Sequence, residues 1–113
     1  MRILFIDPFE FEDPSTEESL KIAIASKKQT DDVKVFVAST PDGAVTRVLP
    51  TPRCFSEDIG YGLIRKHLKE FAGIVLPASC AWPTYVLDDS GDEWDVVLES
   101  PTQFIRYQWS TSA

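Results

Sequence analysis

The sequence predicts an α+β fold, a two-layer sandwich in which two helices cover one face of a mixed, mainly antiparallel sheet. Two observations lead to this prediction. Two segments carry apolar residues at helical spacing, and short apolar or alternating runs typical of strands lie around them. The chain has 113 residues, of which 43% are hydrophobic, so we expect one core and a single domain, residues 1–113.

The first two predicted elements are a strand and a helix. Residues 2–6 (RILFI) form a continuous apolar run, which is typical of a strand buried on both faces. Ser15 and Glu18 have the spacing of a capping box, in which each side chain binds the other residue's backbone N–H. This spacing predicts a helix that ends near Lys28. The apolar side of this helix would be formed by Leu20, Ala23 and Ile24.

Two further strands are expected before the central helix. Residues 33–38 (VKVFVA) are predicted to form the second strand, and residues 44–49 (AVTRVL), which alternate in polarity, the third. The turn between them contains Gly43, which can adopt a positive φ. A strand–helix–strand order in this half would allow a parallel crossover, and for this reason the predicted sheet is mixed.

The segment from Ser56 to Pro77 is predicted to form the second helix and then an interior strand. Ser56 is a favourable N-cap residue, and Gly73 stands where helices commonly end with a positive φ. Residues 74–76 (IVL) form a short apolar run that Pro77 ends. One stripe of the helix is apolar and consists of Ile59, Leu63, Ile64, Leu68 and Phe71.

The C-terminal third is predicted to form antiparallel strands. Residues 85–87 and 94–98 flank an acidic turn at residues 88–92, so they should form a hairpin. Residues 103–109 (QFIRYQW) alternate in polarity and are expected to form the last strand.

Acidic residues are concentrated in two segments. The chain has 18 acidic and 11 basic residues, a net charge of −7, and residues 7–18 and 88–99 each hold six acidic residues and no basic one. This excess disfavours direct binding to nucleic acid or to an anionic membrane surface. The two segments are either solvated loops that favour solubility, or a surface that docks on a basic groove of a protein partner in place of phosphates. The predicted partner-binding residues are Glu10, Glu12, Asp13, Glu17, Asp88, Asp89, Asp92, Glu93, Trp94 and Asp95.

The sequence contains none of the common catalytic or cofactor-binding motifs. P-loop, dinucleotide-binding, HExxH and GxSxG patterns are absent, and Cys54 and Cys80 have no neighbouring histidines that would complete a zinc site. We therefore expect no catalytic residues, no metal and no cofactor. The apolar run at the N-terminus is too short for a signal peptide, so we expect a cytoplasmic protein with free thiols.

A second hypothesis places a nucleotide at the start of the central helix. Two glycines there would let backbone N–H groups at the helix N-terminus approach a phosphate. One or the other of two arginines would be the phosphate partner, and a tyrosine or the single histidine would take part in the chemistry. This alternative nucleotide site consists of Arg53, Gly60, Tyr61, Gly62, Arg65 and His67.

The same helix resembles a segment of a known family. Residues 59–61 (IGY), followed by Leu68, Glu70, Gly73 and Pro77, resemble the helix segment of the small viral ring nucleases, which degrade cyclic oligoadenylate. In that family a histidine that acts as general acid follows the Ile-Gly pair, and Tyr61 occupies this position here. The resemblance therefore implies a relative that binds a cyclic oligonucleotide without that histidine to cleave it.

The preferred interpretation is a small acidic binding or inhibitor protein without enzymatic activity, of the type that phages and mobile elements encode. It would occupy a basic surface of a protein partner, one that normally binds nucleic acid. If the chain forms a homodimer, exposed Trp82, Trp94 and Trp109 are the expected anchors.

Overall fold

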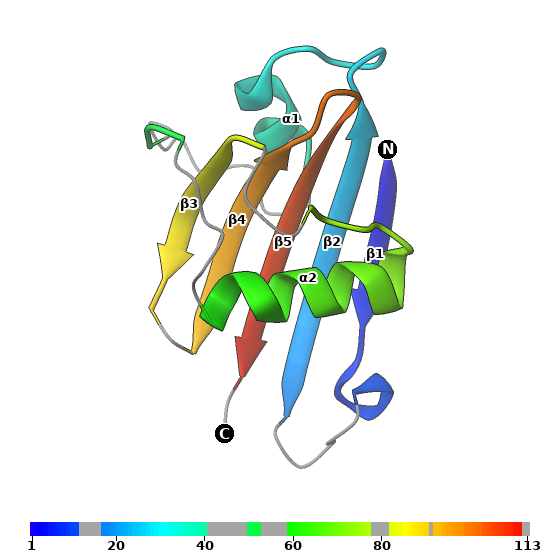
Figure 1. The fold of residues 1–113 in the computed structure, drawn as a ribbon. Coiled ribbons are helices and arrows are strands. Elements are labelled where there is room, and N and C mark those ends of the chain that lie inside the picture. Colours follow the sequence, from blue (N-terminus) through cyan, green and yellow to red (C-terminus); the bar gives the residue numbers. More distant parts are fainter. Residues whose placement is uncertain (12–16, 41–49, 53–58, 78–81, 91, 112–113) are drawn as a thin grey trace.

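The structure is a computed structural model that describes residues 1–11, 17–40, 50–52, 59–77, 82–90 and 92–111. Its centre is a five-stranded sheet with the strand order β1-β2-β5-β4-β3 (Figure 1). The strands are β1 (Arg2–Ile6), β2 (Glu18–Ser26), β3 (Thr84–Asp89), β4 (Glu93–Glu99) and β5 (Gln103–Thr111). The short 3-10 helix η1 (Pro8–Glu10) follows β1, and the two described α-helices are α1 (Val33–Ser39) and α2 (Ile59–Ala72). The α+β class is confirmed.

All neighbouring strands of the sheet are antiparallel. The hairpin predicted around residues 88–92 is confirmed as β3–β4, and the predicted last strand is confirmed as β5. The prediction of a mixed sheet is wrong for the described strands. It depended on a strand–helix–strand order in the first half of the chain, and two segments there have the opposite secondary structure.

The first of these segments is β2, which the sequence predicted to be a helix. β2 lies between β1 and β5, and its residues 22–25 are buried on both faces, Ile22 and Ile24 in the core under α2 and Ala23 and Ala25 in the core under α1. A strand buried on both faces shows a continuous apolar run instead of alternation, and helical spacing can be found in such a run by chance. Ser15 of the proposed capping box lies outside the described residues. The buried side chains of β2 are Leu20, Ile22, Ala23, Ile24 and Ala25.

The second segment is α1, which the sequence predicted to be a strand. Asp32 is its N-cap and accepts a hydrogen bond from the backbone N–H of Lys34 at 2.8 Å. Only Phe36 is fully buried in this helix, whereas Val35 is 52% exposed. The burial of Phe36 and the N-cap hydrogen bond of Asp32 therefore outweigh the preference of the three valines for a strand. The strand predicted at residues 44–49 lies outside the described residues.

Helix α2 agrees with the prediction over most of its length. Ile64 and Leu68 are completely buried, and Gly73 ends the helix with a φ of 68°. The predicted N-cap Ser56 lies outside the described residues. The strand predicted at residues 74–76 is wrong, because this segment lies outside the sheet and Val75 is 69% exposed.

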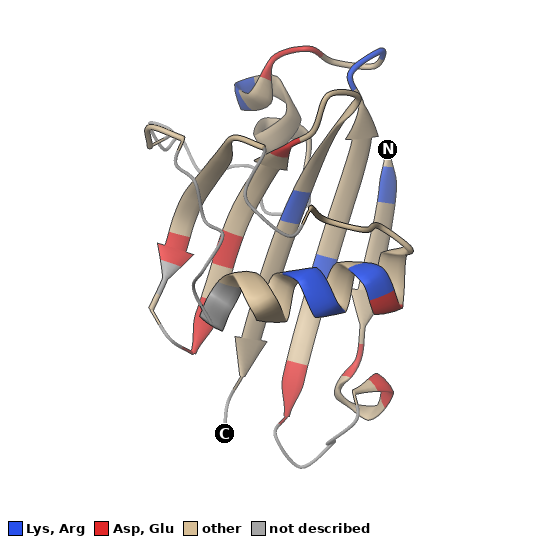
Figure 2. Cartoon of the chain, in the orientation of Figure 1, with Lys and Arg blue, Asp and Glu red and all other residues tan. Residues whose placement is uncertain are grey.

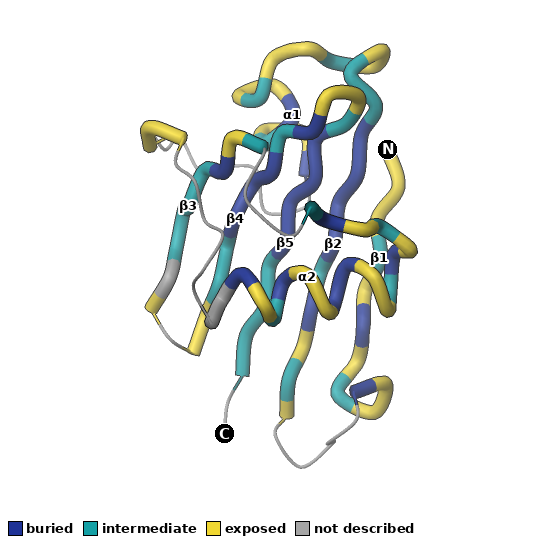
Figure 3. The backbone as a smooth tube through the Cα atoms, viewed as in Figure 1, coloured by how far each residue is buried: buried dark blue, intermediate teal, exposed yellow. Residues whose placement is uncertain are grey.

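The two helices pack on opposite faces of the sheet, so the prediction that both cover one face is wrong. Figures 1 and 3 show α2 across one face and α1 behind one end of the other. Successive residues of a strand point to opposite faces, and the two core clusters follow this rule. On the α2 side the core includes Ile22, Ile24, Val96, Leu98, Ile105 and Tyr107. On the α1 side Phe36 packs with Ala23, Ala25, Val97 and Phe104.

Strand β1 forms one edge of the sheet, and its predicted burial on both faces is wrong. Its burial alternates, with Ile6 buried and Phe5 61% exposed. The face that carries Phe5 is the face that α1 covers only at its far end (Figure 1). None of the described helices has the length and apolar character needed to cross a membrane.

Candidate functional site

The topology brings most of the described acidic residues of the two segments to one end of the sheet, whereas Glu99 lies at the other end, where it pairs with Lys27. In an antiparallel sheet of this order, β1, β3 and β5 end where β2 and β4 begin. Figure 2 shows acidic residues on η1 and on the strand ends at this end of the molecule. We call these residues the acidic end. Its described members are Asp7, Glu10, Glu17, Glu18, Asp88, Asp92 and Glu93.

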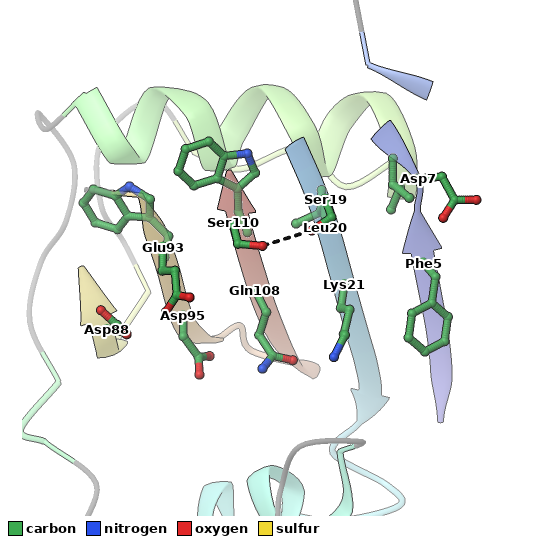
Figure 4. A pocket seen from close by; sticks show the side chains of 13 residues that line it. Phe5, Asp7, Ser19, Leu20, Lys21, Asp88, Glu93, Asp95, Gln108 and Ser110 are labelled. Atoms are coloured by element: carbon green, nitrogen blue, oxygen red, sulfur yellow. Dashed lines mark hydrogen bonds between the residues drawn. The ribbon is translucent and has the colours of Figure 1, made fainter. Parts of the chain in front are cut away.

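A groove of about 390 Å³ crosses the acidic end and is lined by residues of all five strands (Figure 4). It lies on the face opposite α2, where α1 does not reach. The register shows how it is built, because one side chain from each strand occupies the same row across the sheet. That row consists of Phe5, Lys21, Gln108, Asp95 and Asp88.

A second row, one step closer to the strand ends, is also polar. The hydroxyl oxygens of Ser19 and Ser110 lie 2.9 Å apart and share a hydrogen bond, and Glu93 pairs with Ser110 on the next strand. Trp94 and Trp109 lie beside this row but pack toward the core under α2. The floor of the groove is therefore hydrophilic, with aromatic rings at its border.

The lining of the groove is negatively charged. It includes four carboxylates, Asp7, Asp88, Glu93 and Asp95, and one ammonium group, that of Lys21. Such a concave surface attracts cationic groups, because low-dielectric walls focus the field of the carboxylates.

Asp95 differs from the other carboxylates because a buried arginine neutralises it. Arg106, which is 4% exposed, donates from Nε to Oδ1 at 3.0 Å and from Nη2 to Oδ2 at 2.8 Å. Its Nη1 donates to the hydroxyl of Thr40, the C-cap of α1, at 2.6 Å. The positive charge of Arg106 also interacts favourably with the negative, C-terminal end of the α1 helix dipole. We therefore assign Asp95 mainly to the fold.

Neutral donors orient several other acidic side chains. The Glu10 carboxylate accepts from the backbone N–H of Asp7 at 2.8 Å. Asp88 accepts from the backbone N–H of Ser90 at 3.0 Å, and Asp92 accepts from its hydroxyl at 3.1 Å. A neutral donor fixes the position of a carboxylate without cancelling its charge, so these groups keep their negative charge while held in place.

The predicted partner-binding residues are spread over described and undescribed parts of the chain. Glu10, Glu17, Asp92 and Glu93 are exposed at the acidic end, and Asp88 is half-buried there. Glu12, Asp13 and the side chain of Asp89 lie outside what the structure describes. Trp94 is half-buried and contacts the core.

The four residues of the alternative nucleotide site whose surroundings the structure describes do not surround one cavity. Tyr61 and His67 are buried toward the sheet, whereas Gly62 and Arg65 are exposed. The hydroxyl of Tyr61 donates to the carbonyl oxygen of Pro77. Arg53 lies outside the described residues, and the side-chain environment of Gly60 in the first turn of α2 is likewise not described. Of the described residues of this site, Tyr61, Gly62, Arg65 and His67 do not line the groove.

His67 is part of a buried aromatic cluster. Its Nδ1 lies 2.6 Å from the hydroxyl of Tyr107, and the ring of Phe11 meets it edge-on at 5.4 Å between centroids. Burial lowers the pKa of His67, an effect that Lys66 reinforces and Glu18 opposes. Burial also raises the pKa of Tyr107. Both groups are therefore neutral at physiological pH, and their hydrogen bond holds α2 to β5.

Several groove residues were not predicted from the sequence. In β2, Ser19 and Lys21 alternate with buried Leu20 and Ile22, whereas in β5 Gln108 and Ser110 lie on either side of half-buried Trp109. In β5 the alternation of polarity predicted the strand but did not single out Gln108. In β2 the helix prediction concealed the alternation.

Comparisons of this chain with protein families, with curated proteins and with solved structures found no match. Within the described residues, no group of three or more histidine, cysteine, aspartate or glutamate side chains is arranged to hold a metal ion.

Proposed function

We propose that this protein is a small non-enzymatic binding module whose acidic end docks on a basic segment or surface of another protein. The observation that carries this proposal is that described acidic residues of two segments, about 70 residues apart in the sequence, lie together at one end of one sheet. Dispersed carboxylates would serve solubility alone. Carboxylates gathered around a groove create a local potential that steers a cationic partner to one place.

Two exposed aromatic side chains support a protein partner over a small cation. Phe5 lines the groove and is 61% exposed, and Phe9, between Asp7 and Glu10 on the chain, is 87% exposed. Aromatic residues that insert into a partner supply much of the energy of protein interfaces, whereas charges at the rim mainly set the association rate and specificity. Phenylalanines beside carboxylates fit a basic surface that also contains apolar pockets.

The proposal extends to the nature of the partner. A protein surface that binds nucleic acid is basic and often carries hydrophobic or aromatic pockets between its lysines and arginines. The acidic end would occupy such a surface in place of phosphates. This mode of action suits an inhibitor of the kind that phages and mobile elements encode, acting in the cytoplasm.

The test is binding of a lysine- and arginine-rich peptide, measured by calorimetry at low and at high salt. The variant Asp92→Asn/Glu93→Gln should bind about tenfold more weakly than the unchanged protein at low salt. The matched control Asp31→Asn/Glu70→Gln removes the same charge from exposed residues that do not line the groove, one before α1 and one on α2, and should bind almost normally. Equal weakening in both variants would show that only net charge matters and would contradict the proposal.

A further inference from the structure

The two edge strands of the sheet differ in how well they are protected from pairing with another chain. β3, at one edge, has a register shift between Val86 and Asp88 and ends in acidic residues. Such irregularities and charges prevent a further strand from adding. β1, at the other edge, pairs with β2 in regular register over all five of its residues. No described strand pairs with its outer edge (Figure 1).

The side chains of β1 are also unusually apolar for an exposed edge. The structure has six large exposed apolar residues among those it describes, and three of them are Met1, Ile3 and Phe5. Ile3 is 38% exposed and Phe5 61% exposed, and both point to the face opposite α2 because they alternate with Leu4 and Ile6. A regular, apolar, unpaired edge strand is a template for the addition of another strand.

We propose that β1 pairs in antiparallel orientation with β1 of a second copy of this chain, with Leu4 opposite Leu4. The two sheets then form one continuous sheet through a two-fold axis perpendicular to it. Such an axis requires that one residue of β1 lie directly opposite the same residue of the second copy. Centring on Leu4 places Ile3 opposite Phe5 of the second copy, so that each exposed apolar side chain meets another. Centring the axis on Phe5 would instead place the apolar side chain of Ile3 opposite the carboxylate of Asp7, so the apolar side chains would not meet.

Electrostatics favours the antiparallel orientation. β1 begins with Arg2 and is followed by Asp7 and Glu10 at the acidic end. Antiparallel pairing brings Arg2 of each copy toward the acidic end of the other, and it carries the two acidic ends to opposite ends of the joined sheet. Parallel pairing would set two acidic ends side by side in a protein whose net charge is already −7, which costs energy through repulsion.

Such a dimer has a consequence for the groove. Phe5 forms the β1 side of the groove, and Ile3 of the second copy would extend this wall. Each dimer would present two grooves on the same face of the joined sheet, one at each end. Pairing through β1 does not depend on what the acidic end binds, so the dimer and the proposed function can fail separately.

Sedimentation equilibrium over a series of protein concentrations tests the dimer. The unchanged protein should show reversible dimerisation, and Ile3→Lys should raise the dissociation constant at least about tenfold, since it places a charge in the pairing edge. Val35→Lys is the matched control, because it changes another exposed apolar residue on α1 and should leave dimerisation unchanged. A monomer at all concentrations up to about a millimolar, the weak limit of specific association, would overturn the proposal.

Disulfide trapping tests the register in a background with Cys54 and Cys80 changed to serine. Directly opposed residues in antiparallel strands have Cβ atoms about 5 Å apart, close to disulfide geometry, whereas diagonal residues are about 7 Å apart. Ile3→Cys protein mixed with Phe5→Cys protein should form a mixed disulfide dimer, and neither should pair efficiently with itself. Self-pairing of Ile3→Cys alone would contradict the Leu4-centred register. A different result would also overturn the dimer. The protein would stay monomeric and bind the basic peptide, and Ile3→Lys would abolish this binding, which would assign the β1 edge to another partner.

Discussion

Arg106 and Tyr107 are neighbours on β5, yet they join the sheet to different helices by different chemistry. Arg106 points to the face of α1, where its guanidinium binds Asp95 and the hydroxyl of Thr40. Tyr107 points to the face of α2, where its hydroxyl meets His67. One contact is a buried ion pair and the other is a hydrogen bond between neutral groups.

The difference reflects how much apolar surface each helix buries. α2 contributes Tyr61, Ile64, Leu68 and Ala72 to a large core. The neutral hydrogen-bonded pair of His67 and Tyr107 can therefore be buried there, away from water. α1 contributes Phe36 as its one fully buried side chain, and its C-terminus is held by a cation. The short helix depends on electrostatics and the long helix on packing. The polar groove occupies the part of the α1 face that this short helix leaves uncovered.

The largest effect is expected on the α1 face. Asp95→Ala would leave the guanidinium of Arg106 buried without its counter-ion, which should lower the free energy of unfolding by about 3–5 kcal/mol. Urea denaturation measures this loss. Asp92→Ala, in the same hairpin but exposed, should cost about half a kcal/mol or less. The double variant Asp95→Ala/Arg106→Met should recover much of the loss, and a double variant as unstable as Asp95→Ala would contradict this account.

A smaller effect is expected for the neutral pair on the α2 face. Tyr107→Phe keeps the ring in the core but removes the hydroxyl that meets Nδ1 of His67, and an unsatisfied buried nitrogen costs about 1–3 kcal/mol. Tyr85→Phe is the control, because the hydroxyl of Tyr85 lies 3.5 Å from Glu99 and makes a weaker contact. Thermal or urea unfolding should separate the two variants, and equal stabilities would show that the hydroxyl of Tyr107 contributes little.

The smallest effect is a pH dependence that only the α2 face should produce. Burial lowers the pKa of His67 below its ordinary value of 6.5, so between these two values the unfolded chain binds a proton that the folded protein does not. The contribution of His67 to the free energy of unfolding should therefore be fully present above pH 6.5. It should decrease on acidification below that pH, with a slope of at most about 1.4 kcal/mol per pH unit. His67→Gln should flatten this slope in urea titrations between pH 7.5 and about 5.5, above the range where carboxylates titrate. An unchanged slope in the variant would assign the pH dependence to other groups.

Elements with strong local patterns were predicted correctly from the sequence. The apolar stripe of α2 and the positive φ at Gly73 follow from spacing and from the steric freedom of glycine. The β3–β4–β5 meander follows from alternation between turns. The two acidic segments were also visible, because charge is a property of composition.

Only the tertiary structure decided the nature of β2 and α1 and the shape of the acidic end. β2 is a strand because it pairs with β5, more than 70 residues away along the chain. Its residues 22–25 are buried on both faces, which removes from this part the alternation that identifies a strand. α1 is a helix because a cap, one phenylalanine and the buried Arg106 stabilise it there. The groove exists because an antiparallel order places five strand ends together. Pairings between distant segments are set by the burial they achieve jointly, and no local window of sequence contains that information.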